Sequence, residues 1–360
     1  MSSHSAGPAS GQPARAGQPA GPDPSQAARP DQPARPARPD GPAATAASPA
    51  RPAQPRALIV TVYGLYAREA AGWLSVAALI RLMAGLGVDE PAVRSAISRL
   101  KQRGLLEARR ENGAAGYGLS RHGRAVLAEG DRRIFDRPRA SASDGWLLAV
   151  FSVPENERSR RHTLRSRLVW LGFGTVSAGV WIAPGHLEGE TRDMLGSYGL
   201  SDYVTLFRAD YVAFGNVREQ VGRWWDLARL EQLYQAFIDI AAPVLDRWRT
   251  AAAGAGSAAG AVSGARVGHG ASTGSGAAAG GDAAGGSDEG AFADYVRVLT
   301  DWRRLPFLDP GLPAGLLPAD WHGARAAELF DALRTRLAEP AHQHVLAITG
   351  RTGQGITAKP

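Results

Sequence analysis

The stretch DEPAVRSAISRLKQRGLLEARR, residues 89–110, carries the strongest local structure signals in the chain. Asp89 is a favoured N-cap, and Pro91 fits the first turn of a helix, where a missing N–H group costs nothing. Gly104 suits the left-handed conformation in which many helices end. The stretch therefore predicts a helix that begins at Asp89 and ends at Gly104.

The two faces of this helix differ in chemistry. At about 100 degrees per residue, four apolar residues fall on one inward face: Val93, Ala96, Ile97 and Leu100. The outward face carries Arg94, Ser95, Ser98, Arg99, Lys101 and Gln102. Arginine binds guanine bidentately, glutamine pairs with adenine, and serine hydroxyls are permissive. The outward face therefore favours DNA reading, with an ordinary solvated helix face as the alternative.

The sequence on either side of this helix predicts a small three-helix unit. Before it, Leu58, Val62 and Leu65 share the face of a first helix, and Ser75 caps a second. After it, residues 105–120 form two extended pieces around a glycine-rich tip at 112–116, and a last helix covers 121–135. This order over residues 56–137 is that of a winged helix-turn-helix. Three residues near the tip extend the predicted DNA contacts: Arg109, Arg110 and Asn112.

The positive charge of the chain is concentrated in the same segment. Of the net charge of +7, residues 56–137 contribute an excess of 14 basic over 8 acidic residues, whereas residues 138–250 hold 13 of each. Localised positive charge is typical of a nucleic-acid-binding module. Genomic base composition explains why arginine replaces lysine, but it does not explain why the excess is local.

The remaining sequence divides into structured and low-complexity segments. Residues 144–210 follow the order strand, helix, strand, strand, helix, strand, which predicts a ferredoxin-like domain. Residues 217–250 form a helical connector and residues 291–348 a helical C-terminal domain, so the fold class is α+β. The composition predicts a disordered Ala/Pro-rich tail at 1–55, a flexible Ala/Gly/Ser-rich insertion at 251–290 and a frayed end at 349–360.

Catalytic and metal-binding signals are weak. The chain has no cysteine, which excludes disulfides and cysteine-bound zinc, and it has no phosphate-binding GxxxxGK[ST] loop. We therefore expect no catalytic residues, no metal and no cofactor. No apolar run is long enough to span a membrane and no secretory signal is evident, so we expect a cytoplasmic protein with no membrane partner.

Tryptophan residues gather beyond the predicted DNA-binding unit, and most are expected in the core. Aromatic rings beside arginines could also line a pocket for a bulky, partly anionic effector. The candidates for such contacts are Arg223, Trp225, Arg303 and Trp321.

Three segments together resemble the PaaX family of bacterial transcriptional regulators, which is named for repression of phenylacetic acid degradation. The first is residues 56–123, the second is WLLAVFSVPENERSRRHTLRSRLVWLGFGTVSAGVWIAP at 146–184 with RWWDL at 223–227, and the third is WRRLPFLDPGLPAGLLPADWHGARAAELFDAL at 302–333. The resemblance implies a repressor that is released by an aryl-acyl-CoA such as phenylacetyl-CoA. It also implies that the middle domain shares the fold of a CRISPR-associated nuclease and supports dimerisation. Ser152 and Pro154 stand where such a nuclease needs a metal-binding aspartate, so nuclease activity is not implied.

The sequence thus predicts a homodimeric repressor of a phenylacetate-type catabolic operon that binds double-stranded operator DNA. Two recognition helices in successive major grooves require an inverted-repeat operator. A protein of another class remains as the alternative: an acyl-CoA-binding protein or thioester-processing enzyme that uses the winged unit for interactions. The operator sequence and the effector are not specified by the sequence.

Overall fold

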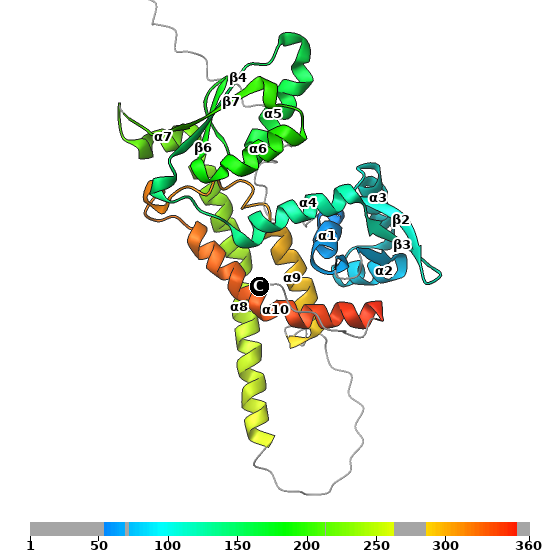
Figure 1. Ribbon diagram of the computed structural model, residues 1–360. Coiled ribbons are helices and arrows are strands. Elements are labelled where there is room, and N and C mark those ends of the chain that lie inside the picture. Colours follow the sequence, from blue (N-terminus) through cyan, green and yellow to red (C-terminus); the bar gives the residue numbers. More distant parts are fainter. Residues whose placement is uncertain (1–53, 69–71, 213, 263–285, 351–360) are drawn as a thin grey trace, which may run out of the picture. The chain divides into compact units, whose positions relative to one another are not determined.

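The computed structural model of the protein describes residues 54–68, 72–212, 214–262 and 286–350 (Figure 1). The predicted disordered tail, apart from its last two residues, most of the predicted insertion and the end of the chain from residue 351 lie outside these ranges.

The N-terminal segment is a winged helix-turn-helix. Its helices are α1 (Pro55–Val62) with the π-helical turn η1 (Tyr63–Ala67), α2 (Val76–Gly85), α3 (Glu90–Gln102) and α4 (Arg121–Asp131), which continues as the π-helical turn η2 (Arg132–Asp136). Its strands are β1 (Trp73–Ser75), β2 (Leu106–Glu111) and β3 (Ala114–Leu119), in the sheet order β1-β3-β2. The Ser75 and Asp89 side chains accept hydrogen bonds from the backbone N–H groups of Ala78 and Ala92, so both predicted N-caps are confirmed.

The sheet of the wing differs from the prediction in two ways. No strand was predicted before the second helix, but residues 73–75 form a strand that pairs with β3. The glycine-rich tip was expected at 112–116, whereas the turn contains only Asn112 and Gly113, with φ of 48° and 78°. Two residues with positive φ make a tight hairpin whose twist matches that of the strands, so pairing continues up to the turn.

The middle domain has the ferredoxin-like order. Its elements are β4 (Trp146–Phe151), α5 (Arg158–Trp170), β5 (Gly174–Ser177), β6 (Val180–Pro184), α6 (Glu188–Ser197) and β7 (Val204–Ala209). The strands form an antiparallel sheet in the order β5-β6-β4-β7, and Leu147, Ala149 and Phe151 of β4 pack into a core with residues of α5 and α6. The other face of β4 is partly covered by the cluster around Trp146 and Trp225.

The C-terminal part is helical. It contains α7 (Val217–Trp224), α8 (Leu227–Val262), α9 (Asp288–Trp302) and α10 (Gly323–Thr349), with a proline-rich loop between α9 and α10. The predicted continuous helical region from 217 is broken at Trp225, which is extended because its ring packs on Gly174, where a Cβ atom would approach it to 2.7 Å. Helix α8 continues to Val262, past residue 250, because alanine has the highest helix propensity.

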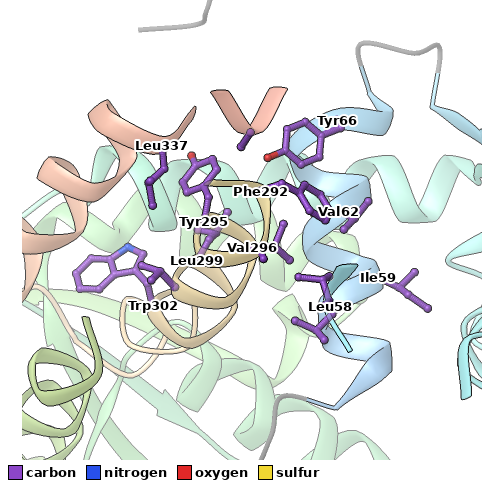
Figure 2. Close-up of a cluster of buried hydrophobic side chains, with 14 of the residues drawn as sticks. Leu58, Ile59, Val62, Tyr66, Phe292, Tyr295, Val296, Leu299, Trp302 and Leu337 are labelled. Carbon is purple, nitrogen blue, oxygen red and sulfur yellow. The ribbon is translucent and has the colours of Figure 1, made fainter. Parts of the chain in front are cut away.

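The first helix of the winged unit is shared with the C-terminal domain. Buried side chains of α1 and α9 belong to one hydrophobic cluster, and Figure 2 shows Leu58 and Val62 beside Phe292 and Val296. The Thr61 and Thr300 hydroxyl groups lie 2.7 Å apart inside this contact. The winged unit is therefore packed onto the C-terminal helices through α1.

Candidate nucleic-acid interface

Helix α3 buries one face and exposes the other. The buried residues are Val93, Ala96, Ile97 and Leu100, which are the four residues that the helical spacing predicted. They share a core with α1, α2 and β2. Because this core holds α3 on one side, its opposite face is presented to solvent in a fixed orientation.

All six outward residues of α3 are exposed in the structure. Arg94 has 62% of its side chain exposed and forms an ion pair with Glu90, with 2.7 Å between Nε and Oε1. Exposed pairs of this kind contribute little to stability, so exchanging Glu90 for a DNA group costs little. Ser95, Ser98 and Gln102 accompany Arg94 on a face with both hydrogen-bond donors and acceptors.

Lys101 connects the outward face to the wing. Its ammonium group lies 5.8 Å from the ring centroid of Tyr117 in β3. The Tyr63 hydroxyl donates a hydrogen bond of 2.9 Å to the Tyr117 carbonyl, and burial raises the pKa of Tyr63 well above its ordinary value. Tyr63 therefore remains a neutral donor that ties the hairpin to the helical core.

The two wing arginines lie on opposite faces of the hairpin. In the register, Arg110 pairs with Ala115, two residues from Tyr117, so Arg110 is on the face that carries Tyr117 and Lys101. Arg109 pairs with Gly116 on the other face, where its Nη2 atom lies 2.9 Å from Glu111. The structure thus brings Arg110, but not Arg109, to the side of the wing that faces α3.

Trp73 fixes the base of the wing. Its Nε1 atom donates a hydrogen bond of 3.2 Å to the Arg109 carbonyl, and a Cβ atom at Gly116 would lie 2.4 Å from its ring. A glycine is therefore required where the ring crosses β3. Asn112 is exposed at the turn. Arg103, which follows the last residue of α3, is also exposed, although the predicted outward face ended at Gln102.

The structure does not bring all four predicted effector contacts together. Trp225 is buried and its Nε1 atom donates a hydrogen bond of 2.9 Å to the Gly172 carbonyl. Trp321 packs against the same hydrophobic cluster, and Arg223 is exposed. Arg303 lies against α1, where it donates to the Ala57 carbonyl at 3.2 Å and burial lowers its pKa to about 10.

A separate cavity of about 250 Å³ lies where the segment after α4 meets the middle and C-terminal domains, and none of the four candidates lines it. Within the described ranges, no group of three or more side chains is arranged to hold a metal ion. No described helix is long and apolar enough to cross a membrane.

Comparison with family models gives matches to three consecutive parts of the chain. The models are described as PaaX-like protein for residues 54–123, PaaX protein central Cas2-like domain for residues 139–221, and PaaX-like protein C-terminal domain for residues 279–347. Together they cover all three folded parts in order.

Two known proteins are similar over most of the chain. The Transcriptional repressor PaaX of Escherichia coli strain K12 is 26% identical over 308 residues, which is 84% of this chain and 86% of that protein. A solved structure, the uncharacterized protein Rv0674 from Mycobacterium tuberculosis, is 22% identical with a TM-score of 0.45, and the match covers 80% of this chain and 98% of that one.

Proposed function

Because the chain belongs to the PaaX family of transcriptional repressors, we propose that it represses transcription by reading operator DNA with the outward face of α3. The observation that carries the proposal is the division of α3 into a buried apolar face and an exposed face of cationic and hydroxyl or amide side chains. A helix of this kind, held by a three-helix core and followed by a hairpin, enters the major groove in winged helix-turn-helix proteins.

The proposed contacts divide by chemistry. Arg94, Ser95, Ser98, Arg99 and Gln102 lie in the groove and contact base edges. Lys101 and Arg110, on the side of the wing that faces α3, neutralise phosphates. Arg109 and Asn112 contact the backbone from the other face and the tip of the wing.

A second copy of the chain completes the proposed operator complex. Leu148 and Val150 lie on the face of β4 that points away from α5 and α6. Phe207 of β7 pairs with Leu148 on the same face. Phe207 and Val150 are 50% and 38% exposed, which is high for large apolar residues. An apolar strip on a sheet face supports dimerisation of the middle domain, and a two-fold dimer requires an inverted-repeat operator with half-sites about one helical turn apart or a multiple of it.

The proposed ligand is an aryl-acyl-CoA such as phenylacetyl-CoA, and the proposed target is a phenylacetate-type catabolic operon. An effector that binds better to a dimer with the wrong helix spacing shifts the population away from the DNA-bound form. The proposal places the protein in the cytoplasm, where DNA and acyl-CoA meet, and it includes no catalytic step.

A gel shift on the promoter region of the protein's own gene tests the proposal. We expect a shifted band that weakens as salt rises and disappears with phenylacetyl-CoA, but not with coenzyme A. Absence of a shift at low salt contradicts DNA binding, and hydrolysis of the thioester during the assay supports the alternative of a thioester-processing enzyme.

A further inference from the structure

The cavity of about 250 Å³ is built by three parts of the chain that are far apart in sequence. The segment after α4 contributes Arg133 and residues 136–139, and the middle domain contributes Leu171, His186, Leu187 and Glu190. The C-terminal domain contributes Tyr234, Trp302, Pro306, residues 309–311, Gly323 and Ala327. A molecule in this cavity therefore touches the DNA-binding, middle and C-terminal parts at once.

All three arginines in the wall have a protein partner. Arg133 donates hydrogen bonds to the Trp170 carbonyl at 2.8 Å and to Glu190 at 3.2 Å, and its guanidinium lies 4.7 Å from the centroid of the Trp170 ring. Arg139 pairs with Asp309 at 3.3 Å. Asp309 also accepts hydrogen bonds from the Tyr234 hydroxyl at 2.7 Å and the Gly311 N–H group at 2.8 Å. These contacts make a rigid, charge-balanced wall.

Two other polar atoms of the wall lack a partner. The Nη1 atom of Arg137 and the Nδ1 atom of His186 are buried and have no hydrogen-bond partner among the described residues. Arg137 is held from its other side, because Nη2 donates to Asp331 and the guanidinium lies 5.3 Å from the centroid of the Trp302 ring. Buried donors are nearly always satisfied by protein or water, so an unpaired guanidinium N–H group beside a cavity is a donor that a ligand or a bound water can satisfy.

The size and the apolar walls limit the ligand. Leu171, Leu187, Trp302, Pro306 and Ala327 provide apolar surface. Pockets for drug-sized molecules begin at about 300 Å³, so this cavity holds a compact acyl group but not a whole coenzyme A thioester. Burial lowers the pKa of His186, with Asp144 and Glu190 opposing this effect and Arg133 adding to it, so the imidazole is neutral at pH 7.

We propose that this cavity is the effector site, and that it takes a compact aryl or branched acyl group whose carbonyl or carboxylate oxygen accepts a hydrogen bond from Arg137 Nη1. The proposal rests on the proposed function, since it names where the effector of that repressor binds. The acyl group comes either from a free acid or from the end of a thioester that extends out of the cavity.

The position of the cavity explains how occupancy reaches the DNA-binding unit. Residues 132–136 form the π-helical turn that continues α4, and the Ile134 carbonyl accepts a hydrogen bond of 3.2 Å from Trp302. Ala140 donates to the Gly311 carbonyl at 2.8 Å. A ligand wedged between these contacts displaces the segment that closes the winged unit, and thereby changes the orientation of α3 relative to the second copy.

Equilibrium binding to the full-length chain tests the site, with phenylacetate and phenylacetyl-CoA as probes and coenzyme A as the negative control. Arg137→Gln removes the unpaired donor, and Ala327→Leu fills the cavity from α10. Arg158→Gln is the matched control, because it removes an exposed arginine that lies outside the cavity. We expect saturable binding of at least one probe to the wild-type chain, at least tenfold weaker binding by the first two variants, and a change of less than threefold in the control.

Equal affinity in the wild-type chain and the Ala327→Leu variant overturns the proposal, as does failure of both probes to bind the wild-type chain. Tighter binding of the thioester than of the acid assigns the acyl group to the thioester, and the reverse order assigns it to the acid. Operator binding without ligand is measured in parallel for every variant. If the wild-type chain does not bind the operator, the proposed repressor function is contradicted. The ligand-binding result for the cavity is independent of that outcome.

Discussion

Arginine side chains on α3 and the wing are exposed to solvent, whereas an arginine in the wall of the cavity is buried. Arg94, Arg99 and Arg110 are exposed, and the ion pair of Arg94 with Glu90 lies at the surface. Arg133 has only 9% of its side chain exposed and binds two carbonyl groups and Glu190. An exposed guanidinium exchanges its partner for a phosphate or a base at low cost, whereas a buried one requires fixed partners.

Not all of the positive charge counted in residues 56–137 is at the surface. Residues 56–137 hold 14 basic and 8 acidic residues, but Arg133 and Arg137 are among the basic ones and pair with Glu190 and Asp331 outside the segment. These two arginines join domains and are not available to DNA. Only the exposed basic residues remain as candidates for contacts with DNA.

Removal of a buried arginine is the largest expected effect. Arg133→Met leaves Glu190 and two backbone carbonyls without their donor, so we expect a loss of about 3 to 5 kcal/mol in the free energy of unfolding. Urea denaturation followed by tryptophan fluorescence measures it. Arg158→Ala is the control because its ion pair with Glu155 is exposed, and a similar loss in both variants breaks the distinction between the two environments.

Removal of an exposed arginine is expected to change DNA binding but not stability. If Arg94 contacts a base, Arg94→Ala weakens binding to the operator by about 1 to 3 kcal/mol and reduces discrimination at one base position. Fluorescence anisotropy with wild-type and single-base-substituted operators measures both quantities. Unchanged operator affinity removes Arg94 from the set of base contacts.

The two arginines of the wing are expected to differ in how much each contributes to the salt dependence of DNA binding. Arg110→Ala is expected to lower the slope of log affinity against log salt by about 1, because one phosphate contact is lost. Arg109→Ala is expected to change the slope less, since Arg109 lies on the face away from Lys101. Equal slopes in the two variants contradict the orientation of the wing that is proposed here.

The smallest expected effect concerns pH and the wall of the cavity. Burial lowers the pKa of His186 below its ordinary value of 6.5, so the folded state binds its proton less readily than the unfolded state. The contribution of His186 to the free energy of unfolding is therefore fully present above about pH 6.5, and it decreases as the pH falls below that value. The urea midpoint of His186→Gln should depend less on pH between 7 and 5 than that of the wild-type chain, and identical dependence contradicts the assignment.

Local periodicity explains what the sequence predicted well. The core face of α3 follows from four apolar residues at helical spacing, and the caps at Ser75 and Asp89 follow from side chains beside their own helices. The strand at residues 73–75 is too short to show a periodic pattern of apolar residues. It forms because it pairs with β3. The exposed contacts on α3 and the wing are located by the fold, and their role in DNA binding stays a prediction.

Long-range packing explains what the sequence missed. The effector candidates were chosen because aromatic residues and arginines are near each other in the sequence, but Trp225 is part of the core and Arg303 holds α1. The cavity that we propose as the effector site joins residues near 137, 186 and 310, whose proximity arises only from the tertiary fold. No pattern within one segment indicates such a site.

The most direct test of the central claim is the affinity of the wild-type protein for its own promoter fragment and for a shuffled fragment of the same composition, measured by anisotropy over a range of salt. The account predicts a preference of at least about 1,000-fold for the promoter at physiological salt, with both affinities falling as salt rises. Equal affinity for the two fragments would contradict sequence reading by α3.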